Sequence, residues 1–103
     1  MRNLIELQEW YKSNCNGEWE HEYGLKIKTL DNPGWEVGLS GENNKKTFNI
    51  FIENSDEDWF CIKADDRKFY GYGGLDNLAI ILEYASLWIH NKFPDLTSNN
   101  RFV

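Results

Sequence analysis

The chain opens with apolar residues at helical spacing. From Leu4 to Tyr11 these residues recur every three or four positions, which places them on one face of a helix. Asn3 followed by Glu6 has the spacing of a capping box, in which each side chain bonds the other residue's backbone N–H. The pattern predicts a helix over residues 3–14.

A period of two replaces the helical period from Trp19 to Leu30. Apolar and aromatic residues and one histidine share one predicted face: Trp19, His21, Tyr23, Leu25 and Ile27. The other face is charged: Glu20, Glu22, Lys26 and Lys28. This alternation is typical of a half-buried strand, which we expect over residues 19–30. The Asn32-Pro33-Gly34 sequence suits a type II turn, so residues 35–40 should return as an antiparallel partner.

Two more strands follow the first pair. Apolar residues alternate through residues 48–52 and again through residues 59–64, on either side of an acidic turn at residues 54–58. The core-facing positions of these strands leave Phe51 and Trp59 on the opposite face of the sheet, because side chains alternate strictly along a strand.

A glycine-rich segment, Gly71-Tyr72-Gly73-Gly74, breaks the strand pattern, and we interpret it as a hinge between strand and helix. Helical spacing of apolar residues then resumes and predicts a helix over residues 75–92 that ends before Pro94. We therefore expect one α+β domain over residues 1–103. It should have two layers, a four-stranded antiparallel sheet with the N-terminal and C-terminal helices packed on one face.

The composition favours a protein partner of opposite charge. The chain has 103 residues, a formal net charge of −6 and a pI near 4.8. An acidic surface repels phosphate backbones and anionic lipid, which argues against nucleic-acid and membrane binding. Aromatic residues make up 16% of the chain and include 5 Trp, and aromatic side chains anchor many protein interfaces.

We expect the binding surface on the open face of the sheet, where exposed aromatic side chains would be ringed by carboxylates. The predicted binding residues are Glu20, Glu22, Glu36, Phe51, Glu53, Asp58 and Trp59.

The chain also suggests where the protein works. The aliphatic run Leu78 to Leu82 is far too short to cross a bilayer, and Glu6 and Glu9 stand where a signal peptide needs apolar residues. We expect a cytoplasmic protein. In that reducing compartment Cys15 and Cys61 should be buried free thiols.

The segment from Glu18 to His21 is the strongest candidate for chemistry, because carboxylates and an imidazole serve both acid–base catalysis and metal binding. In the expected strand, however, His21 and its flanking glutamates point to opposite faces. Cys15 as a nucleophile would stand at a helix C-terminus, whose dipole disfavours the thiolate. The glycine-rich segment lacks the Lys-Ser/Thr of a phosphate loop. We expect no catalytic, metal or cofactor site.

Several motifs together resemble those of the immunity protein 53 family of bacterial polymorphic toxin systems, from residue 4 to about residue 90. They are Trp10-Tyr11, Cys15-Asn16-Gly17-Glu18-Trp19-Glu20-His21, Tyr23-Gly24, Thr29-Leu30-Asp31-Asn32-Pro33-Gly34-Trp35, Asp58-Trp59, and Phe69 with Gly71 and Gly73. The resemblance implies a cytoplasmic, non-catalytic protein that binds and neutralises a cognate toxin. Given the charge of this chain, that toxin should be basic.

Two other classes stay open on the residues alone. A small enzyme could use Glu18, Glu20, His21 or Cys15 if these side chains met in a concave pocket. A ligand-binding adaptor would need an apolar cavity beneath the helices.

Overall fold

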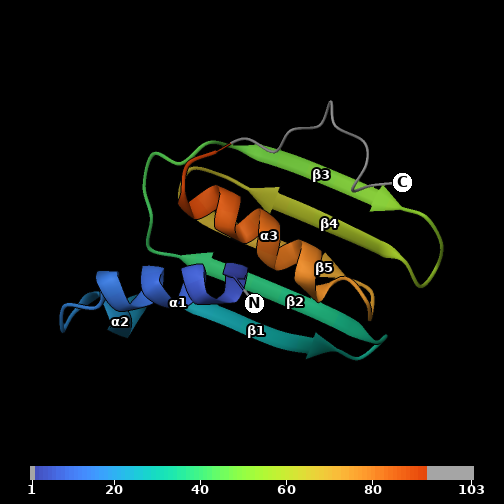
Figure 1. Ribbon diagram of the computed structural model, residues 1–103, viewed down its shortest axis with the longest axis horizontal. Helices are drawn as coiled ribbons and strands as arrows, with labels where there is room; N and C mark the ends of the chain where they lie inside the picture. Colours follow the sequence, from blue (N-terminus) through green and yellow to red (C-terminus); the bar gives the residue numbers. More distant parts are fainter. Residues whose placement is uncertain (1, 93–103) are drawn as a thin grey trace.

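A computed structural model describes residues 2–92 of the protein, and its helices flank one antiparallel sheet (Figure 1). In chain order the elements are α1 (Arg2–Asn14), α2 (Trp19–Glu22), β1 (Leu25–Leu30), β2 (Gly34–Ser40), β3 (Phe48–Glu53), β4 (Trp59–Ala64), β5 (Lys68–Gly73) and α3 (Leu78–Ile89). The α+β class is as predicted. The expected first helix, the second strand and the two strands around the acidic turn are all present within a residue of their predicted bounds.

The sheet has five strands where we expected four, in the order β1-β2-β5-β4-β3. The strand that the sequence analysis missed, β5, lies at the centre and contains Gly71 and Gly73, which we had interpreted as a hinge. These glycines face α3. A Cβ on Gly71 would lie 2.4 Å from Cγ2 of Ile81, and one on Gly73 would lie 2.9 Å from Cδ1 of the same residue. Glycine is therefore required here by close packing of helix on strand.

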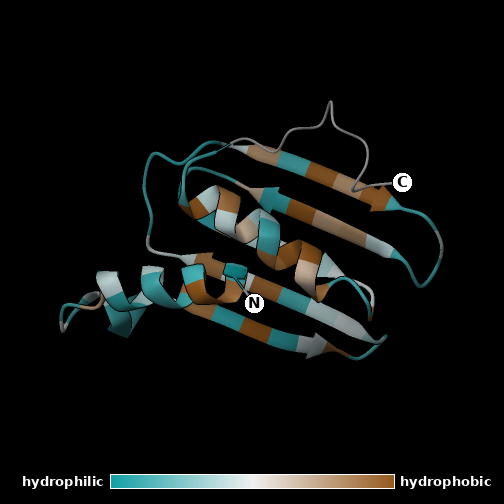
Figure 2. Ribbon diagram, in the orientation of Figure 1, coloured by the Kyte–Doolittle hydropathy of each residue, from teal (hydrophilic) through white to brown (hydrophobic). Residues whose placement is uncertain are grey.

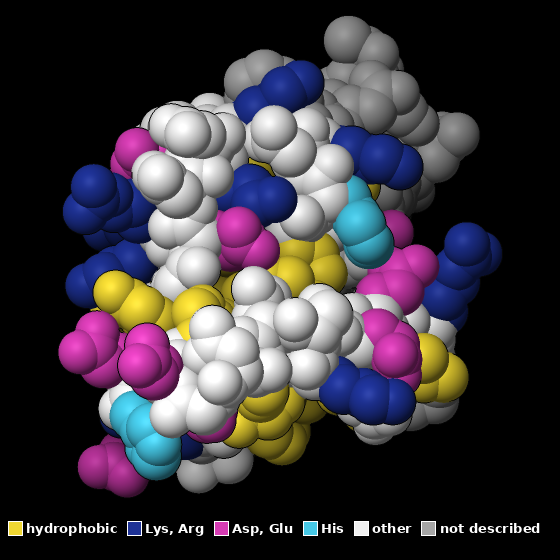
Figure 3. Space-filling model, turned by 90° about the vertical axis from the view of Figure 1, so that its left-hand side faces the viewer, with side chains coloured by type: hydrophobic (Ala, Val, Ile, Leu, Met, Phe, Trp, Pro, Cys, Tyr) yellow, Lys and Arg dark blue, Asp and Glu magenta, His cyan; other side chains and the backbone are white. Residues whose placement is uncertain are grey.

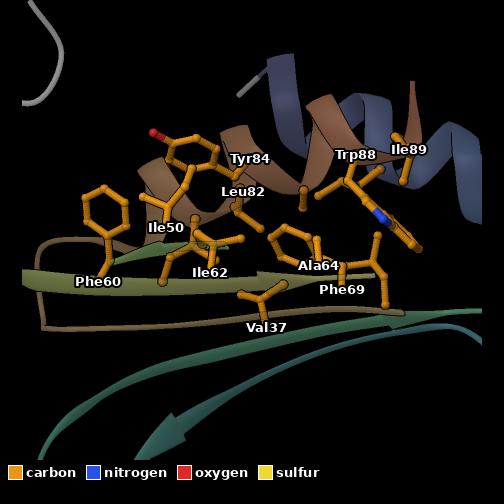
Figure 4. Close-up of a cluster of buried hydrophobic side chains, with 14 of the residues drawn as sticks. Val37, Ile50, Phe60, Ile62, Ala64, Phe69, Leu82, Tyr84, Trp88 and Ile89 are labelled. Carbon is orange, nitrogen blue, oxygen red and sulfur yellow. The ribbon is translucent and has the colours of Figure 1, made fainter. Parts of the chain in front are cut away.

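The core lies between the sheet and α3, as Figure 4 shows. Alternate residues of the central strands point toward the helix and are buried: Val37, Leu39, Ile62, Ala64 and Phe69. From α3, Ile81, Tyr84, Ala85 and Trp88 are at most 1% exposed and meet them. α1 packs beside α3. Figure 2 shows that apolar residues recur along the strands and α3, whereas the loops are mostly polar.

The expected strand over residues 19–30 is wrong in its first half, where α2 forms instead. The side-chain oxygen of Asn16 accepts the backbone N–H groups of Glu18 and Trp19, both at 2.9 Å. The carboxylate of Glu20 in turn accepts those of Asn16 and Gly17, at 3.0 and 2.8 Å. This reciprocal exchange resembles a capping box, and it starts a helical turn where alternation alone favours a strand.

The C-terminal helix, α3, is shorter than the predicted helix over residues 75–92. It begins at Leu78, so Leu75 lies in the preceding loop, where it is 58% exposed. Pro94, which we expected to end this helix, lies outside the described residues. Both cysteines are free as expected, but neither is buried, because Cys15 is exposed and Cys61 is half-buried.

Candidate functional site

Three loops meet at one end of the sheet, the right-hand end in Figure 1. They are the β1–β2 turn, the β3–β4 turn and the β5–α3 loop. Backbone packing at two glycines joins them: a Cβ on Gly34 would lie 2.3 Å from the carbonyl oxygen of Gly73, and one on Gly74 would lie 2.2 Å from that of Glu57. These close approaches make the three loops one continuous surface.

Six exposed carboxylates belong to these loops and the strand ends beside them, and we call this surface the acidic end. Its members are Asp31, Glu53, Asp56, Glu57, Asp58 and Asp76. Residues 29–35, 53–59 and 73–78, which make up these segments, contain no Lys, Arg or His. The acidic end therefore carries a strong negative potential that no basic side chain of its own loops offsets.

Hydrogen bonds hold the β3–β4 turn in a defined shape. The carbonyl of Asp58 accepts the N–H of Asn54 at 2.9 Å, and the Ser55 hydroxyl oxygen accepts that of Asp58 at 3.0 Å. The side-chain amide of Asn77 donates to the Asp58 carboxylate at 3.2 Å and to the Trp59 carbonyl at 2.7 Å. These bonds tie the turn to the start of α3, so the carboxylates are presented from an ordered scaffold.

Apolar side chains interrupt the carboxylates of the acidic end. Trp59 and Trp35 are half-buried, and the indole N–H of Trp35 donates to the carbonyl of Leu75 at 2.9 Å. A small hollow of about 100 Å³ between the loops is lined in part by Trp59, Leu75 and Glu57. The acidic end thus offers apolar contact area as well as charge.

Phe51 adjoins this surface on the open face of the sheet. It is 63% exposed and pairs with Cys61 across the strands, next to the pair formed by Glu53 and Trp59. Phe51, Glu53 and Trp59 therefore share one face, as their strand parity predicted. The prediction that Trp59 is fully on the open face needs refinement, because the β5–α3 loop covers part of it, with Cδ1 3.5 Å from a Cβ built on Gly74.

The remainder of the open face is not dominated by acids. Strand alternation and register place four lysines on it: Lys26, Lys28, Lys63 and Lys68. Glu36 lies among them, with its carboxylate 3.9 Å from the ammonium of Lys28. The expected ring of carboxylates around exposed aromatic residues is therefore displaced from the middle of the open face to the acidic end.

Two of the predicted binding residues, Glu20 and Glu22, lie on α2 and not on a strand. Hydrogen bonds from the backbone N–H groups of Glu20 itself, Asn16 and Gly17 lower the pKa of the Glu20 carboxyl. Glu20 therefore has a structural role in the α1–α2 connection. Glu22 is exposed and lines a hollow that also reaches Glu36 and Tyr70.

The segment that favoured chemistry also has a hollow, beside α2, which Glu18, His21 and Glu22 help to line. All three side chains are exposed. Cys15 is not among the residues that line this hollow. Its side chain interacts with that of Tyr11, and a hydrogen bond between the two is the main cause that raises the pKa of Tyr11. Among residues 2–92, no group of three or more His, Cys, Asp or Glu side chains is arranged to hold a metal ion.

The two ends of the sheet differ in charge. Figure 3 views the end that carries α2 and shows Lys and Arg side chains interspersed with Asp and Glu. The acidic end is at the opposite end of the sheet, and its three loop segments contain acidic residues but no Lys, Arg or His. The uneven distribution singles out the acidic end as the candidate surface for a basic partner.

Several members of the acidic end are not among the binding residues predicted from the sequence. Asp31, Asp56, Glu57 and Asp76 belong to three separate turns, and only the strand order brings those turns to one end. Leu75 falls within the helix predicted over residues 75–92 but lies in the β5–α3 loop of the structure. The signal available in the sequence was that each of three turn segments contained acids and no basic residue.

Comparison with known proteins agrees with the motifs. Searches of curated proteins and of solved structures give no significant match to the chain. Within residues 2–92, every helix is too short or too polar to span a bilayer. A family model described as immunity protein 53 matches residues 4–90, which include every described strand and helix except the first two residues of α1. The chain belongs to the immunity protein 53 family.

Proposed function

We propose that this protein binds a cognate polymorphic toxin in the cytoplasm and neutralises it, with the acidic end and the adjoining Phe51 as the contact surface. Membership of an immunity protein family supports the toxin as partner. The single observation that carries the location is the gathering of six exposed carboxylates around Trp59 and Leu75. The toxin surface that fits them is basic, with an apolar patch at its centre.

The area available suits a standard interface. Such an interface buries about 800 Å² on each partner, and the whole chain exposes 6740 Å². The acidic end and Phe51 therefore need to supply roughly an eighth of the surface. Trp59 and Leu75 would be the apolar anchors, while the carboxylates around them would steer the toxin and set its orientation.

The defined conformation of the β3–β4 turn also favours tight binding. The bonds from Asn77 to Asp58 and to Trp59 restrict the β3–β4 turn before any partner arrives. Ordering a loop on binding costs free energy, so a turn that is already ordered loses less of its interaction energy. Neutralisation in this account needs binding alone, with no turnover by the immunity protein.

The test is to express the chain with the toxin encoded beside its gene. We expect the two proteins to co-purify as a complex and the chain to protect cells that produce the toxin. Asp56→Lys with Glu57→Lys should weaken both effects. A toxin that is neutralised without forming a complex would contradict the proposal.

A second candidate function rests on the hollow beside α2, where Glu18, His21 and Glu22 could perform acid–base chemistry. The discriminating variants are Glu18→Gln and His21→Ala. If neutralisation is enzymatic, either change should abolish it while the complex still forms. Binding through the acidic end instead leaves neutralisation intact in both variants. An adaptor with a ligand beneath α3 is disfavoured, because Ile81 leaves no room above Gly71.

A further inference from the structure

The hollow that Glu22, Glu36 and Tyr70 line has a volume of about 410 Å³ and lies on the open face beyond the acidic end, and we call it the Gly38 groove. In register, Gly38 lies between Lys26 of β1 and Tyr70 of β5. Because Gly38 has no side chain, the row of side chains across the sheet is interrupted there, and the ring of Tyr70 leans toward this position, so that Gly38 and Tyr70 line the groove together.

The walls of the Gly38 groove are held in place by the backbone. Gly24 has a positive φ of 156°, which turns the chain from α2 into β1. Its carbonyl accepts the N–H of Ser40 at 3.0 Å, so the turn is fixed to the end of β2. Glu22 and Tyr23, the residues just before this turn, are thereby placed along the groove.

The side chains that line the groove combine two carboxylates with two aromatic rings. The carboxylates belong to Glu22 and Glu36, and the rings to Tyr23 and Tyr70, which are 44% and 40% exposed. Lys26 also lines it. Glu36 already has a cationic neighbour, because the Lys28 ammonium lies 3.9 Å from its carboxylate, so among the described residues Glu22 is the groove carboxylate with no ion pair.

A guanidinium group can interact with both the carboxylates and the aromatic rings of the groove. Its planar face stacks on aromatic rings, and its N–H groups pair with carboxylates in a bidentate geometry. An ammonium lacks the flat face, and a neutral apolar group would leave the Glu22 carboxylate without a cation. Of the common protein side chains, arginine therefore fits the Gly38 groove best.

The groove also lies within reach of the surface already proposed for binding. Gly38 is four residues along β2 from Gly34, which belongs to the acidic end of the sheet. That separation is about 13 Å at roughly 3.3 Å per residue, less than the width of a standard interface. One partner can contact both.

We propose that the Gly38 groove is a guanidinium site that receives an arginine side chain of the toxin. The identity of the occupant rests on the proposed function, whereas the preference for guanidinium rests on the groove itself. Two variants test it by different routes. Gly38→Val places a side chain in the groove, and Glu22→Gln removes a charge without changing shape.

Both changes are compatible with the fold. A Cβ on Gly38 would lie 3.5 Å from Cε1 of Tyr70, an ordinary contact, and φ at Gly38 is not in the left-handed region. Glu22 is exposed. Gly38→Ala is the matched control, since a single methyl group leaves most of the groove open.

The measurement is the Kd for the toxin encoded beside the gene, together with the melting temperature of each variant. We expect Gly38→Val and Glu22→Gln each to weaken binding about tenfold or more, and Gly38→Ala to weaken it much less, without loss of fold. If the wild-type chain binds the toxin and both variants bind it equally well, the groove proposal is wrong and the proposed function stands.

A second measurement needs no toxin. The backbone amide signals of the labelled chain are followed by NMR while a blocked arginine peptide is added, with the same peptide carrying citrulline as the neutral control. We expect shifts centred on Gly38 and Tyr70 with arginine that are absent with citrulline and reduced in Glu22→Gln. No localised shift, or equal shifts with both peptides, would overturn the site even if the toxin is bound elsewhere.

Discussion

The backbone N–H of Gly74 donates to the carbonyl of Trp59 at 3.0 Å, and this bond joins the loop that precedes α3 to the first residue of β4. It sets the exposed Leu75 beside Trp59, with both lining one small hollow. Two apolar side chains from distant parts of the chain thus form the centre of the acidic end.

Replacing Trp59 should affect binding more than folding. If it is a buried anchor in the complex, Trp59→Ala should weaken toxin binding by about 2 kcal/mol, roughly thirtyfold in Kd. Because the side chain is only half-buried in the free protein, the free energy of unfolding should fall by only about 1 kcal/mol. Isothermal titration and urea denaturation measure the two effects.

Ile5→Ala is the matched control for Trp59, since Ile5 is 55% exposed on α1, away from the acidic end. It should leave toxin affinity unchanged. If Trp59→Ala lowers stability sharply while the folded protein keeps its affinity, Trp59 has a packing role and the centre of the interface lies elsewhere.

Charge at the acidic end should govern the rate of association. Asp56→Lys with Glu57→Lys is expected to lower the association rate constant about tenfold at low salt, because electrostatic steering of a basic toxin is lost. Glu9→Lys with Asp66→Lys changes the net charge equally at exposed positions outside this surface and should have a smaller effect. Stopped-flow mixing at several salt concentrations measures both. A rate that is independent of salt in the wild-type protein would exclude steering.

The contact between β5 and α3 gives a prediction about stability alone. Gly71→Ala should destabilise the fold by about 1–3 kcal/mol through overpacking, because the added methyl group would lie 2.4 Å from the fully buried Ile81. Gly38→Ala, in the neighbouring strand and without such a clash, should change stability little. Equal urea midpoints for the two variants would show that α3 does not pack this closely on β5.

The role of Glu20 can be separated from binding by its pH dependence. Its carboxyl has a pKa below the ordinary value of 4.5 because the ionised form accepts backbone N–H groups. The stabilisation is therefore fully present above about pH 4.5 and is lost as the pH falls through the lowered folded pKa. Glu20→Gln should melt at a lower temperature than wild type at pH 6, and the difference should shrink toward pH 3. An equal difference at both values would contradict this assignment, as would weaker toxin binding by the folded variant.

Much of the fold could be predicted because local pattern and tertiary packing agree. The strands from residue 34 to residue 64 alternate cleanly, and parity alone placed Phe51 and Glu53 on the same face. β5 could not be predicted in this way. Its glycines lower strand propensity, and the reason for their presence, the close approach of Ile81, exists only in the folded protein.

The candidate site was predictable only in part, for a similar reason. The period of two around Trp19 and His21 is real, but a few residues of alternation also fit one helical turn. The hydrogen bonds of the Asn16 and Glu20 side chains to nearby backbone N–H groups favour the helix. Glu20 consequently turns back to the backbone and leaves the predicted surface. The acidic end emerges from strand order, which joins three turns that are far apart in sequence.

Hydrogen exchange of the chain, with and without the toxin encoded beside its gene, shows whether the acidic end is the contact surface. We expect a stable complex in which protection rises in residues 53–59 and 73–77, at the acidic end, and changes little in α1. A toxin that is neutralised without forming a complex, or a complex whose protected segments lie on the helices and leave residues 53–59 unchanged, would contradict it.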